Sequence, residues 1–393
     1  MNLNAKWKIL RPLVSVFLKI KFGYRYKKAY DLPDNYIVVS NHTTDYDPLF
    51  VGVSFPKHMR FVASGHIVRW GRLYKLIDSL VSPIIRQKGA PATGAIKEMM
   101  KTCKNGGSVA MFPEGVRSWD GSMSEILPST AKLIKSLRCG LVTYRISGGY
   151  FTSPMWSEKG TRRGHIHGEP VNVYTKEQLK VMSDEEVYEA ILKDISVDAY
   201  KDQETERHAY RGKRLAEHVE NLLYICPKCG AYDSIVSKGK GVSCEQCNMH
   251  FTYDEYGMLD NIEFVTIKEL SDWQKEQLAK DVAEGKAYEL TQATLSIVET
   301  ETEKVIGKGR VTMDREELYC DGHSFPLSKI THLAMHGKRA VVFTVEETYY
   351  ELCPTGRENA LKIFLYFKQY QKEKEKVDRK RLFSAKQFSI IKS

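Results

Sequence analysis

The segment IVVSNHTTDYDPLFVGV, residues 37–53, decides the fold of the first part of this chain. Its first four residues are mostly apolar and β-branched, which predicts a buried strand. Pro48 disfavours a helical backbone at Asp47 and is well suited to the first turn of a helix through Leu49 to Val53. The segment therefore predicts a strand, a loop and a helix, with His42 at the carboxyl end of the strand and Asp47 at the start of the helix.

The pair formed by His42 and Asp47 is the first candidate site. A carboxylate makes a histidine an effective base because it fixes the tautomer of the ring and stabilises its charged form. Residues five apart on one continuous helix point in different directions, so the loop has to bring these two side chains together. The alternative is that His42 is an ordinary polar residue at a strand end and that Asp47 is only a helix N-cap.

A second motif, FPEGVRS at residues 112–118, follows another short apolar strand. Its proline and glycine predict a turn that exposes the carboxylate of Glu114, the bare backbone at Gly115 and the guanidinium of Arg117. Arginine offers a bidentate fork, and glycine lets a ligand approach the backbone closely. This combination suits a substrate that carries a phosphate group.

The two motifs together resemble the paired signature of the glycerolipid acyltransferases typified by lysophosphatidic acid acyltransferase. The resemblance covers about residues 24–173. It implies that His42 is the general base that acts on the acceptor hydroxyl and that Asp47 orients it. The segment SPIIR, residues 82–86, is similar to the second block of the family. The residues that the resemblance assigns to the glycerol phosphate of the acceptor are Arg86, Glu114, Gly115 and Arg117.

Three positions depart from the family pattern. Thr44 stands where the family usually has serine, which keeps a hydroxyl, and Val116 stands where it usually has threonine, which loses one. The segment LVTYRI, residues 141–146, has the strand character of the fourth block of the family but lacks its usual proline. These departures leave the preference for acceptor and acyl chain open.

Strand and helix patterns alternate through the first half of the chain. Strands are expected at 37–39, 60–63, 108–112, 141–146 and 163–166, and helices at 49–53, 66–80, 93–103 and 130–137. This alternation predicts an α/β fold with a mainly parallel sheet. Both motifs follow strands, and ligands bind beyond the carboxyl ends of such strands, so we expect the motifs to share one cleft.

Four cysteines form a strong metal-binding pattern. Two CxxC knuckles with fourteen residues between them contribute Cys226, Cys229, Cys244 and Cys247. Four thiolates at this spacing predict a zinc ribbon that holds one structural Zn²⁺. Two disulfides or an iron–sulfur site are the alternatives, and the disulfides are disfavoured because the chain shows no secretory signal. His250 is a spare donor, which we expect to begin the last strand of the ribbon instead.

Short strand patterns separated by turns run from Tyr288 to Leu352, and an amphipathic helix follows at 358–370. This order predicts a multidomain protein whose last domain is an antiparallel β-barrel capped by a helix. That architecture resembles a pleckstrin-homology-like domain. Its ligand stays open between a lipid headgroup, a protein partner and the first domain of the same chain.

These patterns divide the chain into seven parts. They are a membrane-contact segment (1–23), an acyltransferase domain (24–182), a helical connector (183–224), the zinc ribbon (225–253), a helical linker (262–290), the pleckstrin-homology-like barrel with its helix (291–373) and a basic tail (374–393).

The 393-residue chain has a net charge of +10, which suits an anionic membrane surface or an acidic cofactor such as coenzyme A. No apolar run approaches the roughly 20 residues that span a bilayer. The segment from Trp7 to Lys19 has a short apolar centre with cationic and aromatic flanks, which favours interfacial contact over ordinary packing on the core. We therefore expect a peripheral protein on the cytoplasmic face of a membrane that contains anionic lipid. Nucleic acid is not expected as a partner, because basic and aromatic residues do not interleave around the cysteine knuckles.

The function that these features favour is an O-acyltransferase of phospholipid biosynthesis. It would move a fatty acyl group from acyl-CoA or acyl carrier protein to the hydroxyl of a lysophospholipid such as 1-acylglycerol 3-phosphate. No covalent enzyme intermediate is expected, because no nucleophilic serine or cysteine fits beside His42. The alternative is a non-catalytic, lipid-binding membrane adaptor with the same cleft.

Overall fold

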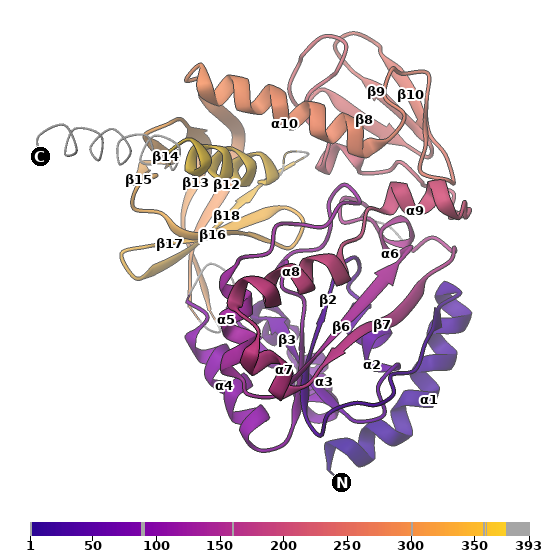
Figure 1. Cartoon of the computed structure of the whole chain (residues 1–393). Coiled ribbons are helices and arrows are strands. Elements are labelled where there is room, and N and C mark those ends of the chain that lie inside the picture. Colours follow the sequence, from indigo (N-terminus) through magenta and orange to yellow (C-terminus); the bar gives the residue numbers. More distant parts are fainter. Residues whose placement is uncertain are drawn as a thin grey trace, which may run out of the picture. The chain divides into compact units, whose positions relative to one another are not determined.

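The computed structural model describes residues 2–87, 91–158, 161–299, 302–356, 358 and 360–374 (Figure 1). The chain divides into two compact units, one before and one after residue 270. The first unit contains both sequence motifs and the four cysteines of the knuckles.

A seven-stranded sheet forms the centre of the first unit, in the order β1-β7-β6-β2-β5-β3-β4. Its strands are β1 (Arg25–Tyr26), β2 (Tyr36–Ser40), β3 (Met59–Ser64), β4 (Ile84–Arg86), β5 (Ser108–Met111), β6 (Gly140–Ser147) and β7 (His167–Tyr174). The five strands from β6 to β4 are parallel to one another, whereas β7 runs antiparallel to β6. The predicted α/β fold is confirmed, with a sheet that is mixed because of β7 and β1.

Helices cover both faces of this sheet (Figure 1). The helical segments between residues 3 and 221 are α1 (Leu3–Phe22), α2 (Asp47–Gly52), η1 (Gly65–Trp70), α3 (Arg72–Val81), α4 (Thr93–Lys104), α5 (Ser129–Ser136), α6 (Gly149–Thr152), α7 (Lys176–Val181), α8 (Asp184–Ile195), α9 (Ala199–Thr205) and η2 (Val219–Asn221). Strand β2 shows why both faces need cover. Ile37 and Val39 join one core with α4, α5, α7 and α8, while Tyr36 and Val38 join the other with α1 and α2.

Two expected elements differ from the structure. The helix expected at 66–80 is divided between η1 and α3, because Gly71 adopts a positive φ of 58° that a helix cannot continue through. The strand expected at 163–166 begins only at His167. Before that point Gly164 lies so close to the Tyr210 ring that a Cβ there would come within 2.1 Å of it, and the chain pairs with Arg211 instead of with β6.

The helix α8 falls within the predicted connector and belongs to the core of the first unit. Its Val187, Ile191 and Ile195 are fully buried against the sheet. Asp194 is also buried, and its carboxylate accepts hydrogen bonds from Thr143 on β6 at 2.7 Å and from Asn172 on β7 at 2.8 Å. These contacts fix α8 on the strands next to the first motif.

The cysteine knuckles belong to a small antiparallel sheet in the order β11-β10-β9-β8. Its strands are β8 (Ile235–Lys238), β9 (Gly241–Cys244), β10 (His250–Tyr253) and β11 (Leu259–Asp260). His250 begins β10, as predicted. Tyr253 packs edge-on against Trp156 at 5.9 Å, and the buried guanidinium of Arg162 lies over both rings. The small sheet is therefore packed onto the α/β part of the same unit.

The second unit contains one antiparallel sheet in the order β15-β14-β13-β12-β18-β17-β16. Its strands are β12 (Tyr288–Val298), β13 (Glu303–Met313), β14 (Glu317–Cys320), β15 (His323–Pro326), β16 (Thr331–His336), β17 (Ala340–Val345) and β18 (Thr348–Pro354). Among the described residues, the edge strands β15 and β16 do not pair with each other, so the predicted barrel is found as an open half-barrel. The helix predicted at 358–370 is observed at 361–374. Of the predicted basic tail, 374–393, only residue 374 belongs to the described residues. The helix α10 (Ile267–Ala283) precedes the sheet.

The first helix, α1, leaves an apolar stripe uncovered. It buries Trp7, Leu18 and Phe22 in the core. The side chains that remain largely exposed are Ile9, Leu13, Val16, Phe17 and Ile20. Their spacing of three and four residues places them on one helical face. No helix among the described residues is long and apolar enough to cross a membrane.

Candidate active site and cysteine cluster

The loop between β2 and α2 brings the predicted pair together. Nδ1 of His42 lies 2.9 Å from Oδ2 of Asp47. The Asp47 side chain is completely buried, whereas about a fifth of the His42 side chain is exposed, at 21%. Because an ionised carboxylate only accepts hydrogen bonds, this contact places the ring proton on Nδ1 and leaves Nε2 of His42 as the proton acceptor.

Asp47 is held in place by the two threonines of the motif. Its carboxylate accepts hydrogen bonds from the backbone N–H groups of Thr43 at 2.5 Å and of Thr44 at 2.9 Å. The Thr44 hydroxyl donates a further bond of 2.7 Å. These donors satisfy the buried charge and fix its orientation, so Asp47 does more than cap α2.

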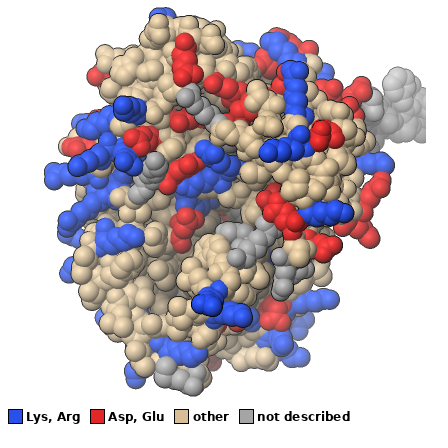
Figure 2. Space-filling view, turned by 180° about the vertical axis from the view of Figure 1, so that it is seen from behind, with Lys and Arg blue, Asp and Glu red and all other residues tan. Residues whose placement is uncertain are grey.

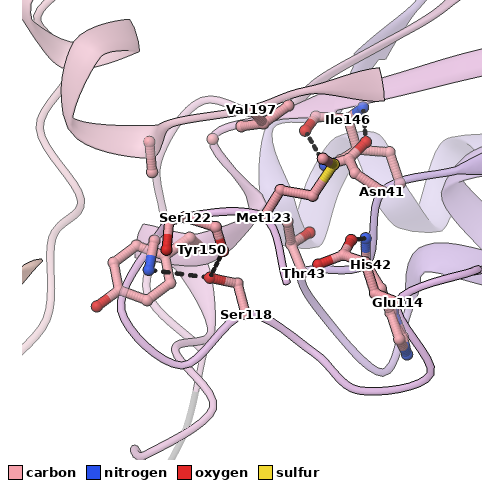
Figure 3. A pocket seen from close by; sticks show the side chains of 13 residues that line it. Asn41, His42, Thr43, Glu114, Ser118, Ser122, Met123, Ile146, Tyr150 and Val197 are labelled. Atoms are coloured by element: carbon pink, nitrogen blue, oxygen red, sulfur yellow. Dashed lines mark hydrogen bonds between the residues drawn. The ribbon is translucent and has the colours of Figure 1, made fainter. Parts of the chain in front are cut away.

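Asn41 and Phe112 hold the histidine in place, the first through the backbone next to it and the second through its ring. The amide of Asn41 donates to the backbone oxygen of Ile146 at 2.9 Å and accepts from the backbone N–H of the same residue at 2.8 Å (Figure 3). These two hydrogen bonds tie the end of β2 to β6. The ring of Phe112 stacks on the His42 ring at a centroid distance of 4.4 Å. Asn41 and Phe112 belong to the two motifs, but their roles depend on contacts between strands that the sequence does not reveal.

Glu114 is buried and faces the protein backbone, which contradicts its predicted exposure. Its Oε1 accepts a hydrogen bond from the backbone N–H of His42 at 2.6 Å (Figure 3). Its Oε2 accepts one from the backbone N–H of Ser124, also at 2.6 Å. Burial raises the pKa of this carboxyl to about 8, although the two N–H groups oppose the shift. Because both oxygens are occupied, Glu114 joins the second motif to the backbone of His42.

Arg117 is also buried, with only 4% of its side chain exposed, and it contacts the first motif. Its Nη1 lies 2.6 Å from Oδ2 of Asp45, a residue that is itself 78% exposed. A phosphate at this guanidinium would compete with the carboxylate of Asp45. The buried Nε of Arg117 has no partner among the described residues.

Gly115 and Arg86 complete the predicted set. Gly115 has a positive φ of 69°, and the position of its missing Cβ is open, so the turn requires glycine and leaves room beside the backbone. Arg86 is exposed at the carboxyl end of β4, which is separated from β2 by β5 and β3. Three strand spacings amount to roughly 14 Å. The structure therefore places Arg86 on the same edge of the sheet but away from the histidine.

A small, mostly apolar pocket adjoins the two motifs (Figure 3). Its lining includes Thr43 and Ser118 from the two motifs, and Met123, Tyr150 and Val197 from outside them. Val197 lies between α8 and α9, well beyond the two motifs. Nothing in its local sequence indicates this position.

Replacing Glu114 with glutamine separates a positioning role from acceptor binding. The amide would satisfy one backbone N–H and leave the other buried and unpaired, which costs about 1–3 kcal/mol. We expect a lower free energy of unfolding and a lower kcat, with the KM for the acceptor unchanged. Denaturant unfolding and steady-state kinetics measure both effects, and Glu125→Gln is the exposed matched control. A higher acceptor KM at unchanged kcat would instead place Glu114 against the substrate.

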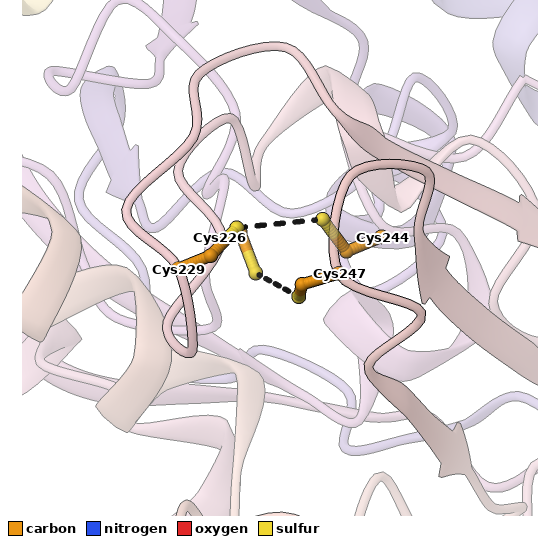
Figure 4. A group of neighbouring side chains, drawn as sticks. All are labelled: Cys226, Cys229, Cys244 and Cys247. Atoms are coloured by element: carbon orange, nitrogen blue, oxygen red, sulfur yellow. Dashed lines mark hydrogen bonds between the residues drawn. The ribbon is translucent and has the colours of Figure 1, made fainter.

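The four knuckle cysteines converge on one point (Figure 4). Their sulfur atoms all lie within 4.8 Å of one another, with 3.7 Å between Cys226 and Cys247 and 3.8 Å between Cys229 and Cys244. Backbone N–H groups of Lys228 and Cys229 hydrogen-bond to the sulfur of Cys226. The cluster can therefore hold a metal ion.

Comparison with known proteins gives a family match for the first part of the chain. Residues 24–147 match the family model described as Acyltransferase. No curated protein matches the chain. Among solved structures, the chain is similar to the 1-acyl-sn-glycerophosphate (LPA) acyltransferase PlsC from Thermotoga maritima, with 18% sequence identity and a TM-score of 0.39 over 50% of this chain and 80% of that chain. Residues 24–147 thus carry an acyltransferase-family match, and both motifs of the candidate active site lie within it.

Proposed function

We propose that this protein transfers a fatty acyl group from a thioester, acyl-CoA or acyl carrier protein, to the hydroxyl of a lysophospholipid such as 1-acylglycerol 3-phosphate. The observation that carries the proposal is the hydrogen bond between His42 and the buried Asp47, because it leaves Nε2 of the ring free to accept a proton. The family match to residues 24–147 supports the reaction class. This activity belongs to phospholipid biosynthesis.

In the proposed reaction, Nε2 of His42 removes the proton of the acceptor hydroxyl as its oxygen attacks the thioester carbonyl carbon. Asp47 stabilises the imidazolium that forms. Collapse of the tetrahedral intermediate breaks the carbon–sulfur bond, and the departing thiolate takes the proton back from His42. The products are an ester and a free thiol, and no bond to the enzyme forms.

Release of free thiol from an acyl thioester tests this proposal directly. We expect release that depends on an added lysophospholipid. Thioester that stays intact with every acceptor and donor would favour the lipid-binding adaptor instead. Measurements with acyl-CoA and with acyl carrier protein as donors, at equal concentration, identify the carrier.

We also propose that the cysteine cluster of the ribbon holds one structural Zn²⁺. Tetrahedral zinc with Zn–S bonds of about 2.3 Å separates its sulfur ligands by roughly 3.8 Å. The sulfur–sulfur distances of 3.7 Å between Cys226 and Cys247 and 3.8 Å between Cys229 and Cys244 fit this spacing. Because four thiolates leave no open position on the metal, the ion would stabilise the ribbon and take no part in acyl transfer.

Peripheral membrane binding through α1 is the third part of the proposal. The exposed stripe that contains Leu13 and Ile20 supports it, since an uncovered apolar face with nearby Lys8 and Lys19 matches an interfacial helix. The neighbouring helix α3 also exposes Leu73 and Leu76. We place the protein on the cytoplasmic face of a membrane with anionic lipid.

Replacing Leu13 and Ile20 together with glutamate tests the membrane proposal without disturbing the core. These side chains are 65% and 70% exposed, so the fold should be kept. We expect sedimentation with anionic liposomes to fall by at least about tenfold, because two apolar side chains no longer enter the lipid. The double variant Leu127→Glu and Val181→Glu changes equally exposed residues elsewhere and is the control. If the two variants bound liposomes equally well, α1 would not be the membrane-binding segment.

A further inference from the structure

A second cavity lies on the edge of the sheet that carries the candidate active site. It has a volume of about 300 Å³ and is lined by residues 163–165, which precede β7, and by His208, Ala209 and Arg211, which follow α9. The carboxyl end of β6 pairs with the start of β7, since Ser147 lies opposite His167. The cavity therefore shares the carboxyl edge of the parallel strands with His42.

Hydrogen bonds and a ring contact hold the frame of this cavity together. Arg163 and Arg211 exchange two backbone hydrogen bonds, of 3.2 and 2.8 Å. The rings of His165 and His208 stack at 4.3 Å. Tyr210 lies buried beneath, and its hydroxyl donates to the backbone oxygen of His165 at 2.9 Å. These contacts hold two arginines and two imidazoles around one opening.

Positive charge dominates the opening. Both arginine side chains are exposed, and neither forms an ion pair within the described part of the chain. Burial lowers the pKa of His165, and the neighbouring charges of His208 and Arg25 lower it further. Glu206 is the acidic residue that opposes this field, and it lies 3.3 Å from His208. Figure 2 shows Lys and Arg side chains gathered along the left edge of the face in view.

The distance between the cavity and His42 indicates whether a phosphate bound in the cavity would belong to the acceptor or to the acyl donor. Strands β2 and β7 are separated by β6, so the cavity lies at least about 10 Å from His42 across two strand spacings. In a lysophospholipid acceptor, the hydroxyl and the phosphate belong to one glycerol unit, which is too short for this span. In coenzyme A, the long pantetheine arm separates the thioester from the nucleotide phosphates.

We propose that this cavity binds the nucleotide phosphates of coenzyme A and that acyl-CoA is the donor. Arg163 and Arg211 contact the phosphates, while the thioester reaches His42 along the edge of the sheet. This assignment of the donor rests on the proposed acyl transfer. The binding itself does not, because it can be measured without turnover.

The test is calorimetric titration of the full-length protein with adenosine 3′,5′-bisphosphate, the phosphate-bearing part of coenzyme A. The double variant Arg163→Gln and Arg211→Gln changes exposed side chains and keeps the backbone bonds. We expect it to bind the bisphosphate at least about tenfold more weakly than the wild type. The variant Lys104→Gln with Lys132→Gln removes the same charge from exposed positions on α4 and α5, and it should bind normally. Undiminished binding by the arginine variant overturns the proposal.

Kinetics then distinguish the sources of phosphate. The arginine variant should raise the KM for acyl-CoA, with the acceptor KM and the rate with an acyl-pantetheine donor unchanged. A rise in the acceptor KM would show instead that the cavity binds the acceptor. A requirement for acyl carrier protein would exclude coenzyme A as the carrier. Either result overturns the assignment. Bisphosphate binding that depends on the arginines, in a protein with no turnover, would contradict the proposed function and keep the nucleotide site.

Discussion

Replacement of His42 with alanine is expected to lower the turnover of acyl transfer by about 10²–10⁴-fold, the usual range for a lost general base. The ring is the side-chain base of this loop, because its Nδ1 is held by the buried Asp47 carboxylate and its Nε2 is left to accept a proton. Its loss removes the proton acceptor but not the loop, because Glu114 and Asp47 bind the backbone of residues 42–44 and not the ring alone. Thiol release measures the effect.

The controls for this prediction separate chemistry from folding. His42→Ala should keep the wild-type free energy of unfolding and metal content. Asp47→Asn should lower both the turnover and the free energy of unfolding strongly, because its amide group would face the N–H of Thr43 or of Thr44 in a buried site. Full activity of His42→Ala would refute the proposed base. If His42→Ala lost both its fold and its activity, the result would not bear on the base. The measurement would then be made on His42→Gln, which keeps a polar side chain.

Loss of the proposed zinc from the cysteine cluster has the largest expected effect on stability. Zinc binding to small ribbons and fingers is worth about 10–16 kcal/mol, and most of this is folding free energy. Between the knuckles, Ile235 and Val242 are the buried apolar side chains, which are too few to form a core without metal. We expect about one zinc per chain in protein purified without added metal. A strong chelator should then unfold the ribbon, as monitored by the fluorescence of Trp156, which packs on Tyr253.

Cysteine variants make the zinc prediction specific. Cys244→Ser should abolish metal retention, whereas Cys353→Ser, in the second unit, should retain one equivalent. His250→Ala should retain it too, because the His250 ring contacts Ser243 at 3.1 Å and the structure assigns it no place in the cluster. Metal analysis that found no zinc, or equal zinc in the Cys244 and Cys353 variants, would refute the site.

Much of the fold follows from local sequence patterns. The apolar run before His42 and the proline after Asp47 place β2, the loop and α2 within one or two residues of their observed bounds. The break at Gly71 was missed, although a glycine inside a helical pattern is a common end point. The packing of α8 was also missed, because the segment was assigned to a connector, although the spacing of Val187, Ile191 and Ile195 is that of a buried helical face.

The inward orientation of the second motif could not be predicted. The turn after β5 contains residues that usually face solvent, and their partners come from distant parts of the chain. Glu114 binds the backbone of Ser124 and of His42, and Arg117 binds Asp45. A single sequence shows which residue types are present, but not which of them meet across the edge of a sheet.

The packing of α8 has a practical consequence for dissecting this protein into fragments. The family match ends at residue 147, yet the sheet face that contains Ile37 and Leu141 is covered in part by Val187, Ile191 and Ile195. A recombinant fragment cut at the end of the family match would present that bare face to solvent and invite aggregation. The ribbon adds a further requirement, because Arg162 donates to the backbone oxygen of Leu215 and stacks on Tyr253. The smallest piece worth expressing alone therefore runs to about residue 270, where the first compact unit ends.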